Sequence, residues 1–554
     1  MSRDLADTLF PGHLPGPDEW ETRYPARGLP AGAEVTRFAP SPTGALHIGG
    51  VYVATIARDV AHHSGGTYFV RIEDTDRSRL VPEAEAQFAE AFDAFGIAPD
   101  PDGLSAWGPA RQSERADIYA AFAADLVGRD QAYPCFCSQA DLAALAERQR
   151  AASVPTGYYG RWAKCRDLSD EDVLELLSAG RTYVIRFRAP GEYPGRVRYT
   201  DRIRGELDLE GNRNDAVILK SSAEAIRLPT YHFAHVIDDH LMRVTLVIRG
   251  DEWISSVPLH LQLAESLGFE PFQYAHIAPL MIQDGGSRRK LSKRKDATAS
   301  VAYYLETGYP PEAVLYYLRG MANGRLAELP FAESFVEPIR LEECGSYGPL
   351  LDVAKLDHVS RNYVAALPGD ELLARIIEWA QKYDPELVGV LTDDRVFARK
   401  VVDVERVDVP NPRKDLFRWA DFRELYGFFF DALFTPTTDP KDERLGGLDA
   451  TVVRDLTTYV VAHYRHDEDQ VAWFAQIREA AAATGFAADP KTYKQNRDAY
   501  HGSIKEASRV VRVALTGSTR SPDLHAVAMA LGADGVRRRL SSLSWAADAE
   551  ASLS

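Results

Sequence analysis

The first part of the chain alternates between strand-like and helix-like patterns. Apolar residues typical of short strands occupy residues 35–38 and 67–72, and helical spacing of apolar residues covers 46–60, 82–95 and 114–127. A strand, a helix and a second strand in this order favour a parallel sheet with helices on its faces. Ligands of such sheets bind at the carboxyl ends of the strands, so we expect the functional site there.

The alternation breaks at residues 133–227. The patterns in this segment predict a helix over 139–152, a second helix capped by Ser169, and strands over 182–188, 196–203 and 216–219. This mixture indicates a separate α+β unit, inserted between two halves of the first fold.

The strand and helix pattern then returns over residues 228–285, with a strand at 243–248, a helix at 257–267 and a strand at 274–281. After Lys295 a helical period dominates, with linker-like breaks at 409–414 and 435–447. We therefore predict an α/β fold: a Rossmann-like, doubly wound catalytic domain with an α+β insertion, followed by an all-helical C-terminal region.

Composition narrows the class of protein. The 554 residues are 45% hydrophobic and 26% charged, as in ordinary globular proteins, and no apolar run reaches membrane-spanning length. Residues 1–33 are acidic and rich in proline and glycine, which predicts a flexible extension and not a signal peptide. Four cysteines are too few for a disulfide framework in a chain of this length. These features predict a cytoplasmic protein, without a membrane partner, built from several domains.

The net charge of −17 argues against a general nucleic-acid-binding protein, which usually has a basic surface. It does not exclude RNA binding, because only the contacting face must be positive. Basic residues do cluster locally, at 288–295, at Arg509 with Arg512, and at 537–539.

The most informative segment is residues 37–50, RFAPSPTGALHIGG. A strand that turns directly into a helix presents free backbone N–H groups and the positive end of the helix dipole to a phosphate. Gly49 and Gly50 would let a flat nucleotide ring approach the backbone, and His47 adds a donor. Far downstream, residues 290–294, KLSKR, follow a glycine-containing loop and supply mobile positive charge.

Together the two segments resemble the HIGH and KMSKS signatures of class I aminoacyl-tRNA synthetases. The first signature resembles the glutamyl-tRNA synthetases in particular, as do residues 71–77, 231–234, 238–242, 247–253, 290–295 and 512–517. Glutaminyl enzymes differ at the first signature and lack an arginine like Arg249. The resemblance begins near residue 34 and runs to the end of the chain.

This resemblance gives each segment an expected role. The implied segments are an extension (1–33), a nucleotide-binding half (34–132), an insertion that grips the tRNA acceptor end (133–227), the second catalytic half (228–285), the KMSKS loop with a stem-contact region (286–365) and a helical anticodon-binding region (366–554).

The implied reaction joins L-glutamate to tRNA(Glu) through a glutamyl-adenylate, with ATP and Mg²⁺, and transfers it to the terminal adenosine; we expect a monomer. Displacement at phosphorus depends mainly on positioning and electrostatics. The expected catalytic residues are His47, Lys290 and Lys293. The residues expected to bind ATP are His47, Gly49, Gly50, Glu252, Lys290, Ser292, Lys293 and Arg294.

Selection of glutamate requires a partner for its buried carboxylate, and arginine can provide two parallel hydrogen bonds. The resemblance assigns this role to Arg37 and Arg249, with Tyr231 as a hydroxyl partner. Glu73 and Ser41 would address the amino group and main chain of the substrate. The chain has His235 where many glutamyl enzymes have asparagine, and we expect this histidine either to donate to the γ-carboxylate or to reshape the pocket.

Cys135, Cys137 and Cys165 resemble the optional zinc site of the family. Tetrahedral zinc needs four ligands, and Asp167 or Tyr159 is the expected fourth. Three reduced thiols without a metal are the alternative.

Other functions stay open at this point. The enzyme could also charge tRNA(Gln) with glutamate. A paralogue that modifies a tRNA base would lack the helical region, whereas this chain continues far beyond Lys293. A nucleotidylyltransferase for small molecules would explain the first signature but neither the insertion nor the two arginines.

Overall fold

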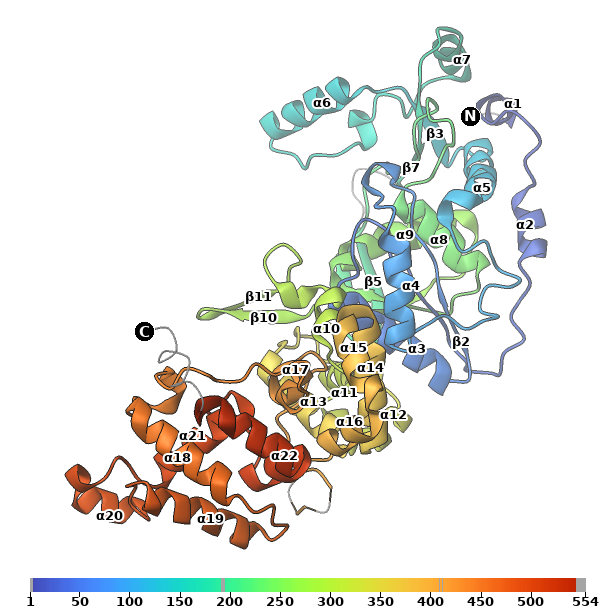
Figure 1. Ribbon diagram of the computed structural model, residues 1–554. Coiled ribbons are helices and arrows are strands. Elements are labelled where there is room, and N and C mark those ends of the chain that lie inside the picture. The colour runs from blue at the N-terminus through green and yellow to red at the C-terminus, as the bar shows by residue number, and fades with distance from the viewer. Residues whose placement is uncertain (1–2, 191–194, 408, 411, 545–554) are drawn as a thin grey trace. The chain divides into compact units, whose positions relative to one another are not determined.

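A computed structural model describes residues 3–190, 195–407, 409–410 and 412–544 (Figure 1). The chain divides into two compact units. Unit 1 comprises Met1–Tyr304 and Val314–Asp352, and unit 2 comprises Leu305–Ala313 and Val353–Ser554. The structural boundary therefore lies at residue 352, ahead of the expected start of the helical region at 366.

The core of unit 1 is built on parallel strands. Strand β1 (Val35–Phe38) pairs with β2 (Thr67–Val70), and β8 (Leu246–Gly250) pairs with β9 (Gln273–Ile277). The backbone N–H of Thr245 donates to the carbonyl of Val35 at 3.0 Å, which places β8 beside β1. The two segments on either side of the insertion thus form one α/β core, as predicted, and their carboxyl ends lie together.

Helices cover this core. They are α3 (Ile48–His63), α4 (Ala84–Ala94), α5 (Ala116–Gly128), α8 (Tyr231–Leu241) and α9 (Val257–Leu267). The predicted helices at 46–60, 82–95, 114–127 and 257–267 are confirmed, with shifts of a few residues at their ends. Helix α8 was not predicted, because its sequence is rich in histidine and aspartate, and several of these polar residues are buried in the folded protein.

The insertion is an α+β unit, as predicted. Strands β3 (Ala132–Cys135), β4 (Val184–Phe187) and β7 (Val217–Leu219) form an antiparallel sheet, and β5 (Arg196–Asp201) and β6 (Gly205–Glu210) form a hairpin. Helices α6 (Gln139–Ala151) and α7 (Asp170–Ser178) project from the sheet (Figure 1). The predicted cap at Ser169 is confirmed: its hydroxyl accepts the N–H of Asp172 at 3.1 Å.

The second signature lies directly after a hairpin. The segment predicted as one strand at 274–281 is divided between β9 and β10 (Met281–Asp284), and β10 pairs with β11 (Ser287–Lys290). Gly285 turns the hairpin with φ 58°, a conformation that glycine adopts without strain. Helices α10 (Val301–Thr307), α11 (Pro311–Ala322) and α12 (Phe331–Val336) follow.

The N-terminal residues are folded against unit 1, so the prediction of a flexible extension is wrong. They form α1 (Arg3–Leu9) and α2 (Pro17–Arg23). Leu5 and Leu9 are buried in a core that includes residues of α5, and the carbonyl of Leu9 accepts the hydroxyl of Tyr183 at 2.9 Å. The spacing of these two leucines is helical, but the acidic, proline-rich composition around them hid the pattern.

The named elements of unit 2 are all helices within its described residues, which confirms the prediction of a helical region. Its helices are α13 (Val353–Ala366), α14 (Gly369–Tyr383), α15 (Pro385–Asp393), α16 (Arg395–Val402), α17 (Asp421–Tyr426), α18 (Ala450–His463), α19 (Gln470–Ala483), α20 (Pro490–Gln495), α21 (Ile504–Thr516) and α22 (Leu524–Ser544). Their apolar faces form one core, in which Trp473 is fully buried.

Both predicted breaks fall between these helices. The break at 435–447 has only one helical turn, at Glu443–Leu445, and residue 411 of the break at 409–414 lies outside the described residues. No helix in the described ranges combines the length and the apolar character that crossing a bilayer would require.

Candidate active site

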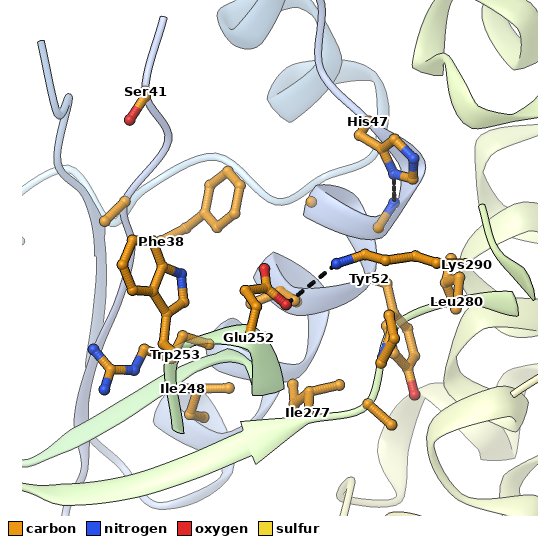
Figure 2. Close-up of a pocket in the computed structure, with 18 of the residues that line it drawn as sticks. Phe38, Ser41, His47, Tyr52, Ile248, Glu252, Trp253, Ile277, Leu280 and Lys290 are labelled. Atoms are coloured by element: carbon orange, nitrogen blue, oxygen red, sulfur yellow. Dashed lines mark hydrogen bonds and ion pairs between the residues drawn. The ribbon is translucent and has the colours of Figure 1, made fainter. Parts of the chain in front are cut away.

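A cavity of about 490 Å³ opens at the carboxyl ends of β1 and β8 (Figure 2). The start of α3, the end of β9 and the loop after β11 complete its walls. The predicted site residues that line it are Arg37, Ser41, His47, Gly49, Gly50, Glu73, Tyr231, Arg249, Glu252, Lys290 and Lys293. Residues predicted from separate motifs thus meet in one cavity. It lies at the carboxyl ends of the strands, where the functional site was expected.

Three predicted residues do not line the cavity. Ser292 and Arg294 flank Lys293 in the loop, and the backbone N–H of Ser292 donates to the carboxylate of Asp296 at 2.9 Å. His235 is fully buried behind the wall. Sequence reasoning in turn missed an apolar wall that includes Phe38, Trp253 and Pro279. The first two lie inside the quoted motifs, but their role depends on the direction of each side chain.

His47 caps helix α3 with its own side chain. Its Nδ1 accepts the N–H of Gly49 at 2.8 Å, so the proton of the neutral ring is on Nε2. A Cβ atom on residue 49 would lie 2.9 Å from this Nδ1, and glycine therefore permits the contact. Burial, together with nearby Lys293, lowers the pKa of His47 to about 4. At neutral pH this side chain is an uncharged N–H donor at a helix N-terminus.

Both lysines of the loop line the cavity. The Lys293 ammonium group donates to the carbonyl of Ala45, just ahead of His47. Lys290 lies 3.4 Å from the Glu252 carboxylate, and Figure 2 shows this pair across the cavity. Two cations, a neutral donor and the start of a helix are the kinds of group that bind phosphate in proteins.

The two predicted arginines differ in their partners. Arg37 Nε lies 3.2 Å from the carboxylate of Asp239, so its charge is already paired inside the protein. Arg249 is 5% exposed, and its nearest acceptors are His276 Nε2 at 3.1 Å, Tyr231 Oη at 3.3 Å and His260 Nδ1 at 3.3 Å. Within the described part of the chain, no carboxylate lies within ion-pair distance of Arg249. Of these two arginines, Arg249 is therefore the one that offers an uncompensated positive charge to a ligand.

His235 has a different place from the one expected. Its Nε2 is 3.5 Å from Arg249 Nη1, and its Nδ1 is 2.8 Å from the carboxylate of Asp239. Burial lowers its pKa to about 3, against the opposing effect of Asp239. Because it lies behind both arginines and off the cavity wall, it contacts Arg249 and does not reach a ligand in the cavity directly.

Glu73 lies on the cavity wall and is held by Arg71, whose Nη2 donates to its carboxylate at 3.0 Å. Arg71 is fully buried and also donates to Asp239, which links Glu73 to Arg37 through one network. Burial raises the pKa of Glu73, although Arg71 and Arg37 oppose it. For Asp239 the two arginines outweigh burial and hold its pKa well below the usual range.

The three predicted cysteines do meet. The Sγ atoms of Cys135, Cys137 and Cys165 all lie within 4.8 Å of one another. The expected fourth ligands are wrong in this geometry, because Asp167 points into solvent near Arg188 and the Tyr159 hydroxyl donates to the carbonyl of Pro155. The hydroxyl of Tyr158 instead lies 3.2 Å from Cys137 Sγ. Three thiols and one phenol fit the four positions of a tetrahedral metal site.

Comparison with known proteins identifies the family of this chain. Residues 34–348 match the family model of the class I tRNA synthetases (E and Q), catalytic domain. A glutamate–tRNA ligase of Clostridium beijerinckii is 39% identical over 97% of this chain and 98% of its own length. A glutamate–tRNA ligase of Sorangium cellulosum is 37% identical over 95% of this chain and 97% of its own.

A solved structure is similar across both units. The crystal structure of a glutamate tRNA ligase from Elizabethkingia meningosepticum, in complex with its amino acid, has a TM-score of 0.72 and 26% identity. The match covers 92% of this chain and 99% of that one. The family model and the similarity over the full length show that the chain belongs to the glutamate–tRNA ligase family of class I tRNA synthetases.

Proposed function

We propose that this protein uses ATP to attach L-glutamate to tRNA(Glu), through a glutamyl-adenylate and with transfer to the terminal adenosine of the tRNA. The uncompensated charge of Arg249, at the end of one cavity that also has a phosphate-binding region, is the observation that carries this proposal. The activity of the relatives supports it. We further propose that the enzyme works as a monomer in the cytoplasm.

In the first step, the α-carboxylate of glutamate attacks the α-phosphorus of ATP, and pyrophosphate leaves. The N–H on Nε2 of His47 can donate to a phosphate oxygen, and Lys290 and Lys293 can stabilise the charge that develops on pyrophosphate. Mg²⁺ bound to ATP would share that charge. The side chains hold the reactants in line and do not form a covalent intermediate.

In the second step, a ribose hydroxyl of the terminal adenosine attacks the carbonyl carbon of the adenylate, and AMP leaves. The insertion is the proposed holder of the acceptor end, and the helical unit 2 is the proposed reader of the anticodon. If unit 2 also accepts the anticodon of tRNA(Gln), the enzyme would charge that tRNA with glutamate. Aminoacylation of purified tRNA(Glu) and tRNA(Gln) in parallel distinguishes these two specificities.

Glutamate is selected through the charge of Arg249. A bound γ-carboxylate would pair with a guanidinium that has no other anionic partner among the described residues. Glutamine has nearly the same shape but would leave that buried charge unpaired. Loss of the pairing costs on the order of a few kcal/mol, which is enough for strong rejection without an editing step.

Replacement of Arg249 tests the function at its selective residue. Arg249→Ala should weaken glutamate binding by about 2–5 kcal/mol and change ATP binding little, because only glutamate brings a carboxylate to this arginine. Pyrophosphate exchange in the presence of tRNA(Glu) gives both KM values.

Arg319→Ala is the matched control, since Arg319 is equally buried and pairs with Asp59 away from the cavity. This variant should be less stable, but it should not raise the KM for glutamate more than the KM for ATP. Equal weakening of glutamate and ATP by Arg249→Ala would contradict the assignment, and absence of exchange with glutamate in the unmodified protein would contradict the function itself.

We also propose that Cys135, Cys137, Cys165 and Tyr158 hold a structural zinc ion in the insertion. The Tyr158 hydroxyl also accepts the backbone N–H of Cys165 at 3.0 Å, so it is fixed beside the three thiols. A zinc ion there would tie the start of the insertion to the loop before α7.

Elemental analysis of protein purified without chelator should give one zinc per chain. Cys137→Ser should lose the metal and lower thermal stability, because structural zinc contributes directly to folding free energy. Cys344→Ser is the control, since Cys344 is buried far along the chain from the cluster and should leave the zinc content unchanged. Protein without stoichiometric zinc would identify the three cysteines as reduced thiols.

A further inference from the structure

Arg249 is oriented by neutral side chains. Its Nε donates to His276 Nε2 at 3.1 Å, its Nη2 to His260 Nδ1 at 3.3 Å, and its guanidinium carbon lies 4.6 Å from the ring centre of Tyr274. Burial, more than any neighbouring charge, lowers the pKa of both histidines. Both rings are therefore uncharged at neutral pH and can accept hydrogen bonds from the arginine.

A neutral histidine can accept at Nε2 only if its proton is on Nδ1, and Asp201 provides the reason for that tautomer. Asp201 Oδ2 lies 2.6 Å from His276 Nδ1. Both side chains are buried, with exposed fractions of 2% for Asp201 and 0% for His276. The carboxylate accepts the Nδ1–H, and the lone pair of Nε2 is left facing Arg249.

The position of Asp201 is itself fixed by the backbone. Its Oδ1 accepts the N–H groups of Ile203 at 3.0 Å, Arg204 at 2.9 Å and His276 at 3.2 Å. Asp201 ends strand β5 of the insertion, whereas His276 belongs to β9 of the catalytic core. The N–H of Arg202 also donates to the carbonyl of Tyr274 at 2.8 Å, so the two strands are joined at this point.

We propose that Asp201 and His276 are positioning residues for the selection of glutamate. Asp201 fixes the tautomer of His276, and His276 orients Arg249 without neutralising it, so that the charge stays available to the γ-carboxylate of the substrate. This inference rests on the proposed function and deepens it.

Histidine suits this role better than a carboxylate would. A carboxylate in direct contact would also hold the guanidinium, but it would form the ion pair that the substrate has to form. An uncharged acceptor satisfies the donor and leaves the charge uncompensated. His260 follows the same pattern: its Nδ1 accepts from Arg249, and its Nε2 lies 2.9 Å from Nδ1 of His232, which can accept the remaining proton.

Asp201→Asn tests the proposal with almost no change in shape. The amide oxygen can keep the three backbone N–H groups only if the amide nitrogen faces His276 Nδ1. The amide nitrogen would then donate to Nδ1 of His276, so the proton of this histidine would move to Nε2. The N–H on Nε2 would face the Nε–H of Arg249, and neither donor would have an acceptor. A buried donor without an acceptor is costly, and we expect the KM for glutamate to rise about 10- to 100-fold, with the KM for ATP within about twofold.

The sign of this effect separates the proposal from simple electrostatics. Asp201→Asn removes a negative charge near the site, which by itself would tighten the binding of an anionic substrate. Weaker glutamate binding, with reduced discrimination against glutamine, is therefore the result that the tautomer mechanism predicts. Unchanged or tighter glutamate binding in an enzyme that activates glutamate normally would overturn it.

Two further variants make the test specific. In His276→Gln, the amide oxygen can still accept from Arg249 without help from Asp201, so Asp201→Asn should add less than about a twofold change in that background. Asp215→Asn is the matched control, because Asp215 is a buried aspartate of the same insertion that is bound by Tyr133 and Arg166. It should lower the melting temperature and leave the ratio of the two KM values unchanged.

The assay is pyrophosphate exchange and aminoacylation with the full chain and tRNA(Glu), together with a melting temperature for each variant. If the unmodified protein does not activate glutamate, the proposed function fails. If it does, and the full effect of Asp201→Asn persists in the His276→Gln background, only the role of this pair fails.

Discussion

At the residue scale, three buried arginines differ in whether a carboxylate compensates their charge. Arg37 and Arg71 are both buried beside Asp239, and their charges are compensated inside the protein. Arg249 is almost equally buried but has neutral partners among the described residues. A buried charge without a counter-ion is unfavourable for the free protein. Such a cost is expected where a ligand supplies the counter-ion, and for this reason we propose Arg249, and not Arg37 or Arg71, as the arginine that pairs with the substrate.

Lys293 should matter for the chemical step more than for binding. Its ammonium group lies beside the start of α3, where it can stabilise charge on the departing pyrophosphate. Lys293→Ala should lower the rate of adenylate formation by about 10²–10³-fold, while the KM for glutamate changes little, because the interaction strengthens in the transition state. Single-turnover formation of the adenylate measures this rate.

Lys295→Ala is the control for charge alone. Lys295 belongs to the same basic cluster but does not line the cavity, so its loss should leave the rate nearly unchanged. A similar decrease in both variants would show that the cluster acts only through its general positive charge, and near-normal adenylate formation in Lys293→Ala would contradict its catalytic role.

The charged residues that line the cavity could be predicted from the sequence, because they belong to short motifs. His47 and Glu73 follow strands that are recognisable locally, and Lys290 and Lys293 lie in one signature. The supporting residues could not be predicted in this way. Asp201 and His276 are 75 positions apart, and nothing in either local sequence indicates that the other is its partner. Such pairs are visible only after the strands that carry them are placed side by side.

At the element scale, the N-terminal helix α1 is part of the folded core. Leu9 is 3% exposed and packs within the core that includes α5, and residue 9 also provides the carbonyl that accepts the Tyr183 hydroxyl. Tyr183 lies in the insertion, immediately ahead of β4. Helix α1 therefore contributes to the packing of both the insertion and α5.

Leu9→Ala should lower the free energy of unfolding of unit 1 by about 2–4 kcal/mol, since it removes buried methyl groups and leaves a cavity. Denaturant unfolding measures this loss. Asp7→Ala is the control on the exposed side of the same helix and should change stability by less than about 0.5 kcal/mol. A negligible effect of Leu9→Ala would mean that residues 3–9 are not part of the cooperative core.

Helix α8 and strand β6 were not identified from the sequence, for different reasons. Helix α8 has polar and charged residues on its buried side, including His235, Asp238 and Asp239, because it supports the network behind the cavity. A hydrophobic period could not identify it. Strand β6 does have the alternation of a half-buried strand, because Leu207 and Leu209 are less exposed than the acidic residues on either side of them. It covers only six residues and pairs with β5 in a hairpin.

At the scale of the whole molecule, the net charge of the chain differs in sign from the charge at its cavity. The chain has a net charge of −17, but four cationic side chains line its cavity, against the two carboxylates of Glu73 and Glu252. The four are Arg37, Arg249, Lys290 and Lys293. Binding of two anionic substrates by an acidic protein is therefore a matter of where the cations are placed. The same burial that creates this site also keeps a group of histidines uncharged, and this makes stability depend on pH.

The free energy of unfolding should fall as pH falls below about 6.5. Burial lowers the pKa of His47 to about 4 and of His235 to about 3, and it also lowers the pKa of His232, His260 and His276. In the unfolded chain these histidines titrate near 6.5. Between that value and the lower folded pKa, the unfolded state binds more protons, so acid favours unfolding.

Each such histidine contributes about 1.4 kcal/mol per pH unit in this range. Hydrogen exchange of backbone amides in α8 and β9, which carry His235 and His276, should show protection that falls steeply from pH 6.5 to 5.5, after correction for the intrinsic exchange rate. Between pH 7.5 and 8.5 the histidines are neutral in both states, and protection should not depend on them. His276→Gln removes one titrating group and should reduce the slope in the acid range but not in the alkaline one. If protection stays constant down to pH 5.5, the histidines take up protons in the folded protein as readily as in the unfolded chain. The neutral histidines proposed as acceptors for Arg249 would then be contradicted.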